Sequence, residues 1–370
     1  MDVNRRNEMK KVIVSVKLRD ILIGILIFNI CIVIFSLIVV GVNKGNRQLK
    51  YGNTENKQIE HNNSKVDLDL KKEKDTILNK KIDSCINLYL TREKRIVKLD
   101  LEQYVLGVVS AEMPANFNIE ALKAQAVAAR TYAVCHTKHL VGGGCSLNAN
   151  ADICDSVHCQ AYISQEKRMK TWPKKERAEL YNKVKEAVES TRGQVLSYDG
   201  ELVMNPYYFA TSSGKTENSE EVFKESKPYL KSVESPGEEV APKYKTQFKF
   251  SNANFTTVMN SQFKGLNLNS NIIKDKINIL ERSQGGSIKQ IKIGNITTTG
   301  KMIRKLFGLP SANFTISFES TNIVFNCKGY GHGVGMSQWG AGVMAREGKK
   351  YDEILRHYYS GIEIKTLNYK

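Results

Sequence analysis

The sequence lacks the short motifs that mark several large functional classes. It has no zinc-finger spacing and no basic motif with interleaved aromatic residues, which argues against nucleic-acid binding. It has no Gly-x-Ser-x-Gly elbow of a serine hydrolase, no His-Glu-x-x-His helix of a zinc protease and no internal repeat. The glycine-rich run at 329–342 lacks the Gly-Lys-Ser/Thr ending of a phosphate loop, and no Rossmann unit is visible.

Acidic residues are few relative to basic ones. The 370 residues include 38 Asp and Glu against 55 Lys and Arg, a formal net charge of +17. Such an excess favours an anionic partner, namely nucleic acid, a membrane surface or an acidic wall polymer. Because nucleic-acid motifs are absent, we expect a membrane or wall partner and no nucleic acid. The length allows one large or two medium domains.

One long apolar run, at residues 21–42, matches the roughly 20 residues that cross a bilayer. Basic residues precede it, so the positive-inside rule predicts a cytoplasmic tail at 1–20. A cleaved signal peptide is the alternative, but the run is long for one and no small-x-small site follows promptly. We expect an uncleaved transmembrane anchor, a flexible linker at 43–80 and an extracytoplasmic domain at 81–370.

Hydrophobic periodicity beyond residue 81 predicts an α+β fold of mixed helices and strands in two lobes, the smaller at about 244–318. Asp100 and Asn118 are expected to cap helices, and Asp199-Gly200 predicts a hairpin turn. The predicted strands are 86–90, 96–99, 194–197, 201–204, 277–280 and 288–293. The predicted helices are 100–113, 118–140, 176–191, one after Ser251, 299–307 and 352–359.

The most informative residue is Glu112, which follows apolar residues and precedes a helix-ending Met113-Pro114. Apolar surroundings raise a carboxyl pKa, and a glutamic acid held neutral near pH 7 can act as a general acid. The alternative is a glutamate that merely ends a helix on the surface. In the next helix, Lys123 and Arg130 lie off the apolar face, where they either line a cleft or are solvated.

Three other polar residues are candidates with an open role. Ser212 and Ser213 lie in a hydroxyl-rich turn, either as hydrogen-bond donors to a ligand or as turn residues. His332 stands among alternating glycines, which let the backbone approach a neighbour or a ligand. It either contacts a substrate or holds its loop together.

Four of the seven cysteines, at positions 135, 145, 154 and 159, crowd within 25 residues. An extracytoplasmic chain commonly uses disulfides, so a bridge from Cys154 to Cys145 or to Cys159 is one interpretation. The other interpretation is a zinc ion held by the thiolates of Cys145, Cys154 and Cys159. Three histidines lie nearby, and histidine is also a zinc ligand. His136 and His139 are the more reachable fourth ligands, whereas His158 adjoins Cys159.

Four blocks in order, within about 81–364, resemble the stage II sporulation protein D family, the sporulation lytic transglycosylases of endospore-forming bacteria. The blocks are 111–114 with 121–132, 154–162, 207–223 and 329–342. The resemblance implies an anchored enzyme with a glycan-binding cleft that cuts MurNAc–GlcNAc bonds of peptidoglycan strands stripped of stem peptides. It would act during forespore engulfment, in the space between mother cell and forespore, beside stage II sporulation protein P (an amidase and endopeptidase) and stage II sporulation protein M.

By the same resemblance, Glu112 matches the catalytic glutamate, and Cys154 and Cys159 match a zinc site that we expect to be structural. Cys145 stands where family members can supply a histidine. The resemblance and the residue patterns together give these candidate cleft residues: Lys123, Arg130, Tyr208, Ser212, Ser213, Thr216 and His332.

Two rival functions are open from the sequence. Wall-amidase enhancer proteins share this sequence domain, so the chain is alternatively a non-catalytic wall-binding module that stimulates an amidase. The second rival is a zinc hydrolase with metal on Cys145, Cys154 and Cys159, which three thiolates and the missing His-Glu-x-x-His disfavour.

Overall fold

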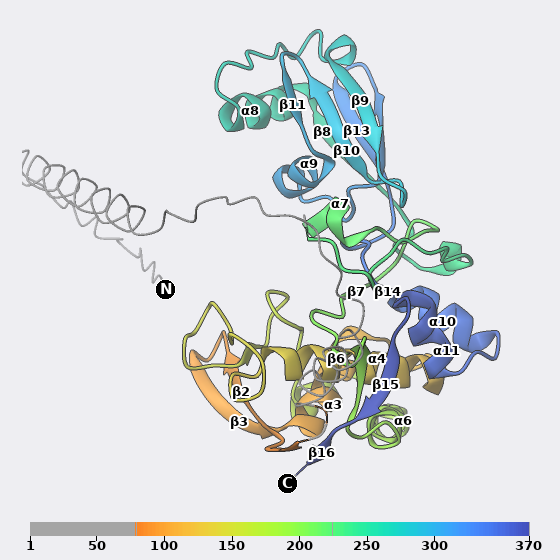
Figure 1. Ribbon diagram of the computed structural model, residues 1–370. Coiled ribbons are helices and arrows are strands. Elements are labelled where there is room, and N and C mark those ends of the chain that lie inside the picture. The colour runs from red at the N-terminus through yellow and green to blue at the C-terminus, as the bar shows by residue number, and fades with distance from the viewer. Residues whose placement is uncertain (1–77, 79, 224, 370) are drawn as a thin grey trace, which may run out of the picture. The chain divides into compact units, whose positions relative to one another are not determined.

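The computed structural model describes residues 78, 80–223 and 225–369, all of which belong to one compact unit at 63–370 (Figure 1). Within these residues no helix combines the length and the hydrophobicity needed to cross a bilayer. The predicted tail, anchor and nearly all of the predicted linker, residues 1–77 and 79, lie outside the described part of the chain.

The first hydrophobic core is built around α4 (Ile119–His136), which packs against four other helices and β5. Alanines occupy six of its fourteen buried positions, and small side chains let neighbouring backbones approach closely. The helices that contact α4 are α3 (Leu101–Glu112), α6 (Arg177–Glu189), α10 (Gln338–Arg346) and α11 (Tyr351–Tyr358).

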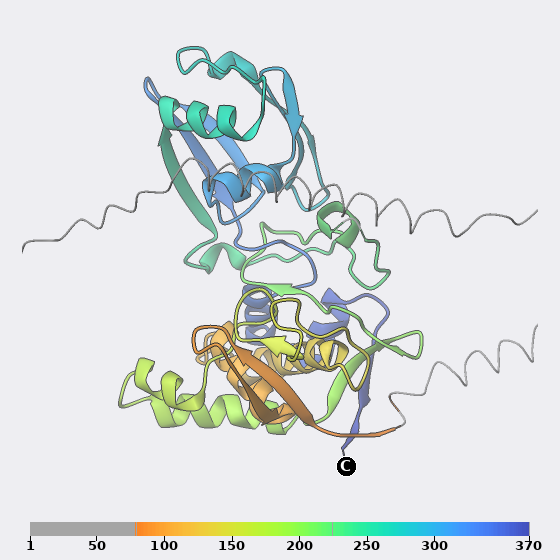
Figure 2. The same cartoon turned by 90° about the vertical axis from the view of Figure 1, so that its left-hand side faces the viewer.

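Short sheets flank this core. Figure 2 shows the orange β2–β3 hairpin beside the helices, and β4 extends it in parallel. The first sheet contains β2 (Cys85–Leu90), β3 (Arg95–Asp100) and β4 (Ile153–Cys154). The others are β5 (Gln194–Tyr198) with β6 (Glu201–Leu202) and β15 (Glu363–Thr366), β7 (Tyr208–Phe209) with β14 (Met336–Ser337), and β1 (Lys81–Ile82) with β16 (Asn368–Tyr369).

A second hydrophobic core draws on residues between 255 and 327, so it includes a strand beyond the predicted limit of 318. Phenylalanine rings pack together at its centre, Phe255 against Phe307 and Phe325. Its antiparallel sheets are β8 (Lys245–Ser251), β12 (Phe314–Phe318) and β13 (Asn322–Lys328), and β9 (Ile277–Arg282), β10 (Ile288–Ile293) and β11 (Ile296–Thr298). Its helices are α8 (Asn252–Gln262) and α9 (Gly300–Phe307).

The short elements α5 (Gln165–Thr171) and α7 (Ser219–Phe223) complete the helices, with 3-10 turns at Glu238–Val240 and Lys274–Lys276. The chain is therefore an α+β protein, as predicted.

Local capping chemistry sets the ends of α3 and α4 largely as predicted. The Asp100 carboxylate accepts the backbone N–H groups at the start of α3, and Asn118 does the same for α4. However, α4 ends at His136, four residues before the predicted Leu140. The Lys138 backbone N–H donates a hydrogen bond to Asp152 Oδ1 at 2.9 Å. This N–H is therefore bonded to a carboxylate 14 residues later in the chain and not to a carbonyl of the helix.

Helix α10 was not predicted, because its glycines disfavour a helix in isolation. A Cβ on Gly340 would lie 2.0 Å from the Tyr358 hydroxyl, and one on Gly342 would lie 2.8 Å from the Phe117 ring. The glycines are thus needed for close packing, and α10 becomes helical because that packing stabilises it.

Candidate functional site

Glu112 is the last residue of α3, and its carboxylate is half-buried rather than exposed. One oxygen accepts the Ala161 backbone N–H at 2.9 Å, and the other accepts the Gln338 side-chain amide at 3.3 Å. Burial raises the pKa of Glu112 above its ordinary value, and these two hydrogen bonds oppose the rise. The carboxyl therefore has the environment of a general acid.

Two hollows adjoin at Glu112. The larger is a cavity of about 770 Å³ that Tyr208, His332 and Gln338 also line, and Glu112 is its only carboxylate among the described residues. The smaller, about 430 Å³, lies against Trp172 and Arg168. Glu112 is the lining residue that the two hollows share.

Tyr208 lies in the larger cavity at a fixed position. Its hydroxyl accepts a hydrogen bond from the Gln160 side-chain amide at 2.8 Å, and Gln160 in turn accepts one from the Tyr104 hydroxyl. Burial raises the pKa of Tyr208 well above its ordinary value, so the phenol stays neutral. A neutral hydroxyl there can hydrogen-bond a polar ligand.

His332 both lines the cavity and holds its own loop. Its Nδ1 accepts the Val334 backbone N–H at 3.1 Å, which leaves the proton of the neutral ring on Nε2. Rings of Tyr207, Phe209 and Phe223 surround it. Burial lowers the pKa of His332 to about 4, so the ring is uncharged at neutral pH.

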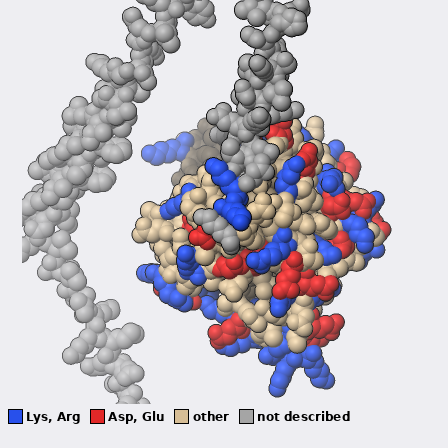
Figure 3. Space-filling model, turned by 60° about the horizontal axis from the view of Figure 1, so that its bottom comes forward, with Lys and Arg blue, Asp and Glu red and all other residues tan. Residues whose placement is uncertain are grey.

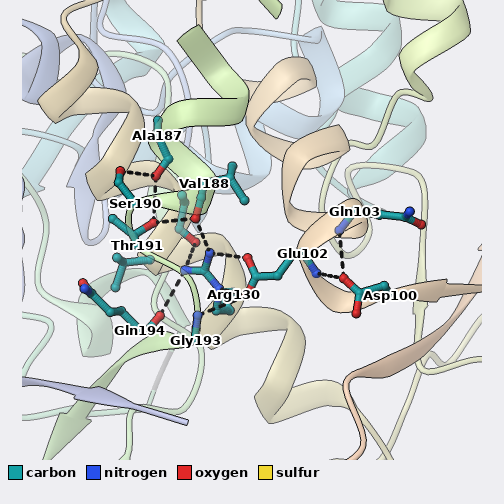
Figure 4. A network of polar contacts seen from close by, with 12 residues as sticks. Asp100, Glu102, Gln103, Arg130, Ala187, Val188, Ser190, Thr191, Gly193 and Gln194 are labelled. Carbon is teal, nitrogen blue, oxygen red and sulfur yellow. Dashed lines mark hydrogen bonds and ion pairs between the residues drawn. The ribbon is translucent and has the colours of Figure 1, made fainter. Parts of the chain in front are cut away.

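The structure does not bring the other predicted cleft residues to the cavity. Arg130 is fully buried and forms a bidentate ion pair with Glu102, at 2.6 and 2.9 Å, while donating to the Val188 and Gln194 carbonyls (Figure 4). Arg130 therefore joins α3, α4 and the end of α6 and is not a cleft residue. Lys123 pairs with Glu120 at 2.9 Å on the surface of α4.

The hydroxyl residues of the predicted cleft are bonded inside the protein. Ser213 Oγ donates to the Gly285 carbonyl at 2.9 Å, and Thr216 Oγ1 accepts the Val233 backbone N–H at 2.9 Å. Ser212 donates to buried Glu238 through both its backbone N–H and its hydroxyl, each at 2.7 Å. These three residues hold turns together, as the alternative interpretation of the serines proposed.

The Glu238 network connects this turn to the residues around Glu112. Glu238 also accepts the hydroxyls of Ser235 and Ser337, at 2.6 and 2.7 Å. Ser337 caps α10, whose first residue is Gln338. Glu238 thus fixes the start of α10, the helix from which Gln338 donates a hydrogen bond to the Glu112 carboxylate.

The metal candidates converge on one point. Cys145, Cys154, His158 and Cys159 place one ligand atom each within 4.8 Å of one another. The His158 Nδ1 lies 3.8, 3.7 and 3.3 Å from the three sulfurs, and Cys145 Sγ lies 3.7 Å from Cys159 Sγ. Tetrahedral zinc with thiolate and imidazole ligands requires separations of roughly 3.5–3.8 Å, so this donor set is compatible with zinc.

His158 is therefore the histidine that lies with the three sulfurs, although its place next to Cys159 made it the least expected. A turn in which the Cys159 N–H bonds the Ser156 carbonyl lets adjacent side chains face the same point. His136 Nδ1 instead contacts the Tyr132 carbonyl, and His139 contacts the Asp83 carbonyl. The described cysteines are all free thiols. Four protein donors leave no open position, which is typical of a structural site.

The cysteine and histidine cluster positions Glu112 through the residues that follow Cys159. Cys159 leads directly into Gln160, which holds Tyr208, and Ala161, which donates to Glu112. A metal on the four donors would fix this segment, and two of the donors, His158 and Cys159, also line the larger cavity.

We expect metal binding to need Cys154 and to stabilise the fold. Cobalt(II) added to metal-free protein should give the strong visible absorption of a tetrahedral thiolate site, and Cys154→Ser should remove most of it and lower Tm. Cys327→Ser, which changes a buried thiol in the second core, is the matched control and should keep the spectrum. An unchanged spectrum in Cys154→Ser would contradict this assignment.

Gln338, Gln160 and Ala161 were missed as site residues, because amides and a backbone N–H carry no sequence signal of their own. Their proximity to a glycine-rich loop and to Cys159 was the only available hint.

Comparisons with known proteins identify the family to which this chain is related. Residues 89–198 match a protein family described as stage II sporulation protein. Stage II sporulation protein D of Bacillus subtilis (strain 168) is 38% identical over 280 residues, which cover 75% of this chain and 78% of that protein. Its counterpart in Bacillus amyloliquefaciens is 36% identical over 281 residues, with 75% and 78% covered.

A more distant relative is the amidase enhancer of Bacillus subtilis (strain 168), 28% identical over 302 residues, which cover 69% of this chain and 39% of that protein. The identity to the two sporulation proteins extends over most of both chains. The chain belongs to the stage II sporulation protein D family.

Proposed function

We propose that this protein is a peptidoglycan lytic transglycosylase that cuts MurNAc–GlcNAc bonds of stripped glycan strands and leaves 1,6-anhydromuramic acid ends. The observation that carries the proposal is one half-buried carboxyl, Glu112, which has a raised pKa and lines two hollows. Family membership supports a role in sporulation, and the amidase enhancer relative supports a cell-wall substrate.

The proposed reaction needs one carboxyl and no water. Protonated Glu112 gives its proton to the glycosidic oxygen as the bond from C1 breaks. The carboxylate then takes the proton of the muramic acid C6 hydroxyl, whose oxygen bonds to C1 and closes the anhydro ring. Because the nucleophile belongs to the substrate, proximity replaces the second carboxylate of ordinary glycosidases.

The residues around Glu112 suit both halves of this reaction. Desolvation favours the protonated acid, while the Ala161 N–H and the Gln338 amide stabilise the carboxylate that forms next. Tyr208 offers a neutral hydroxyl to the sugar, and the uncharged His332 offers a ring face. Any metal on the cysteine cluster would serve to fix the segment before Ala161.

The proposal includes the protein's place in the cell. Residues 21–42 would anchor it with a cytoplasmic N-terminus, and the domain from 81 onward would face the space between mother cell and forespore. Stage II sporulation proteins P and M are the proposed partners on the basis of the family, and the amidase P would remove stem peptides before the strands are cleaved.

The amidase enhancer relative favours a second candidate, a non-catalytic module that stimulates a partner amidase. Purified protein incubated alone with stripped glycan separates the two. We expect soluble fragments with anhydro ends to accumulate without any amidase. If fragments form only when an amidase is added, and only from its own activity, the module function holds instead.

Gln338 should set the pH dependence of cleavage. Gln338→Leu removes a hydrogen bond that lowers the pKa of Glu112, so the acid form should persist to higher pH. We expect the alkaline limb of the kcat/KM profile to move to higher pH and the maximum rate to fall roughly tenfold, as for the loss of one hydrogen bond to a charged group. An unshifted profile with only reduced activity would indicate a purely structural role.

A further inference from the structure

The chain's positive charge is concentrated around its second core. Residues 244–328 carry twelve basic side chains against three acidic ones, an excess of nine out of the net +17. By contrast, acidic and basic side chains are interspersed on the face of the molecule in Figure 3. A segment that holds half of the net charge in less than a quarter of the chain is a candidate surface for an anionic ligand.

One face of the β12–β13–β8 sheet is polar and has a groove of about 470 Å³. The opposite face carries the phenylalanines of the second core, because side chains alternate along each strand. On the polar face, Gln247, Asn326 and Thr315 are opposite one another in register, and the Gln247 amide donates to Asn326 at 2.8 Å. Side-chain amides and hydroxyls in a row suit the hydroxyl and acetamido groups of a sugar chain.

Two lysines stand directly opposite each other at one end of this groove. Lys245 of β8 is the register partner of Lys328 of β13, and both are exposed. Like charges in this arrangement destabilise a sheet. In the described part of the chain, neither lysine forms an ion pair with an acid, so a bound anion would reduce the repulsion between them.

The lysine pair lies next to the larger cavity along the chain. Lys328 is followed after one glycine by Tyr330, an exposed ring that lines the cavity of Glu112. Lys243 lies over the Tyr330 ring at 4.7 Å, and Lys328 lies over the Tyr244 ring at 5.8 Å. Basic and aromatic side chains therefore continue from the mouth of the cavity to the polar face.

We propose that this face is an accessory site for the same glycan strand, with Lys245 and Lys328 binding the lactyl carboxylates that stripped muramic acid residues expose. The inference rests on the proposed function for the identity of the strand. The amide row binds the sugar backbone, and the lysines select strands that carry free carboxylates over neutral polymers. The site lies outside the catalytic cavity, so it increases the affinity for long strands without changing the chemistry at Glu112.

The test compares Lys245→Gln/Lys328→Gln with the matched control Lys274→Gln/Lys276→Gln, which removes two exposed lysines of the same segment outside the groove. Both pairs are made in full-length protein that also carries Glu112→Gln, so that binding is measured without cleavage. For long stripped glycan at low salt, we expect Lys245→Gln/Lys328→Gln to raise the Kd about tenfold. The control variant should leave the Kd within about twofold of its starting value. High salt should remove the difference.

Two further ligands identify the chemistry. Uncharged GlcNAc oligomers should bind the two variants equally, because they lack carboxylates. Equal weakening for both variants on stripped glycan would overturn the proposal. If Lys245→Gln/Lys328→Gln weakened binding to teichoic acid but not to stripped glycan, the proposal would be overturned and the face would instead bind a phosphate polymer.

The outcome is separable from the proposed function. If the wild-type protein never cleaves glycan but binding still depends on Lys245 and Lys328, the accessory site stands and the enzymatic proposal fails. If cleavage by otherwise wild-type protein is normal and the lysine pair leaves KM for long strands unchanged, the accessory site fails alone.

Discussion

Glu112→Gln is expected to abolish glycan cleavage while making the protein more stable at neutral pH. Glu112 is the only carboxyl that the described residues contribute to the larger cavity, so its loss removes both the proton donor and the base, and we expect a fall in kcat of at least about 10³-fold. The amide keeps the size of the side chain but carries no charge to desolvate. Cleavage is measured by release of soluble fragments, and stability by thermal unfolding.

The pH dependence of this stability change follows from linkage. Burial raises the pKa of Glu112, so the native protein keeps a proton that the unfolded chain releases. The stabilisation is full below the ordinary value of 4.5 and is lost as pH rises through the raised native pKa. Glu112→Gln should therefore match the wild type in acid and exceed it in Tm above that window, by about 2–4 °C for each kcal/mol.

Substitutions of two other glutamates serve as controls for the Glu112→Gln result. Glu186→Gln, on the exposed face of α6, should change neither activity nor Tm. Glu176 lines the smaller hollow and tests the two-carboxylate alternative, so Glu176→Gln should reduce cleavage by less than about tenfold. Equal inactivation by Glu176→Gln and Glu112→Gln would contradict a single-carboxyl mechanism.

Arg130→Met should cause the largest loss of stability of any substitution considered. It leaves the Glu102 carboxylate buried with no countercharge, a change that costs about 3–5 kcal/mol. Denaturant unfolding measures this loss. Activity per folded molecule should stay near wild type under conditions where the variant is folded, because Arg130 does not reach the cavity.

The double variant Arg130→Met/Glu102→Gln separates a structural role from a catalytic one. The neutral amide still accepts the Gly193 N–H and the Tyr369 hydroxyl that Glu102 accepts, so part of the lost stability should return. If the Arg130→Met protein were folded and fully stable but no longer cleaved glycan, that result would instead indicate that Arg130 acts in the cleft.

Local chemistry made many elements predictable. Asp100, Asn118, Ser251 and Thr299 cap the helices that follow them, because a cap depends only on its own and the next three residues. The hairpin at Asp199-Gly200 is equally local, since its turn needs the positive φ angles of 51° and 76° that these residues tolerate.

The features that were missed depend on residues far apart in the chain. Gln338 and Glu112 are 226 positions apart, and nothing in either segment indicates the other. Arg130 was placed in a cleft because its partner Glu102 and the carbonyls it binds come from other elements. The metal cluster was predictable as a group of soft donors, whereas the choice of His158 depended on the turn between Ser156 and Cys159.

The origin of the new chain end tests the central claim most directly. Stripped glycan is cleaved by the wild-type protein in water labelled with ¹⁸O, and the fragments are weighed by mass spectrometry. The account predicts anhydromuramic ends with no ¹⁸O, because the C6 hydroxyl of the substrate is the nucleophile. Reducing ends that each carry one ¹⁸O would show that water attacks C1, and a transglycosylase centred on Glu112 would be excluded.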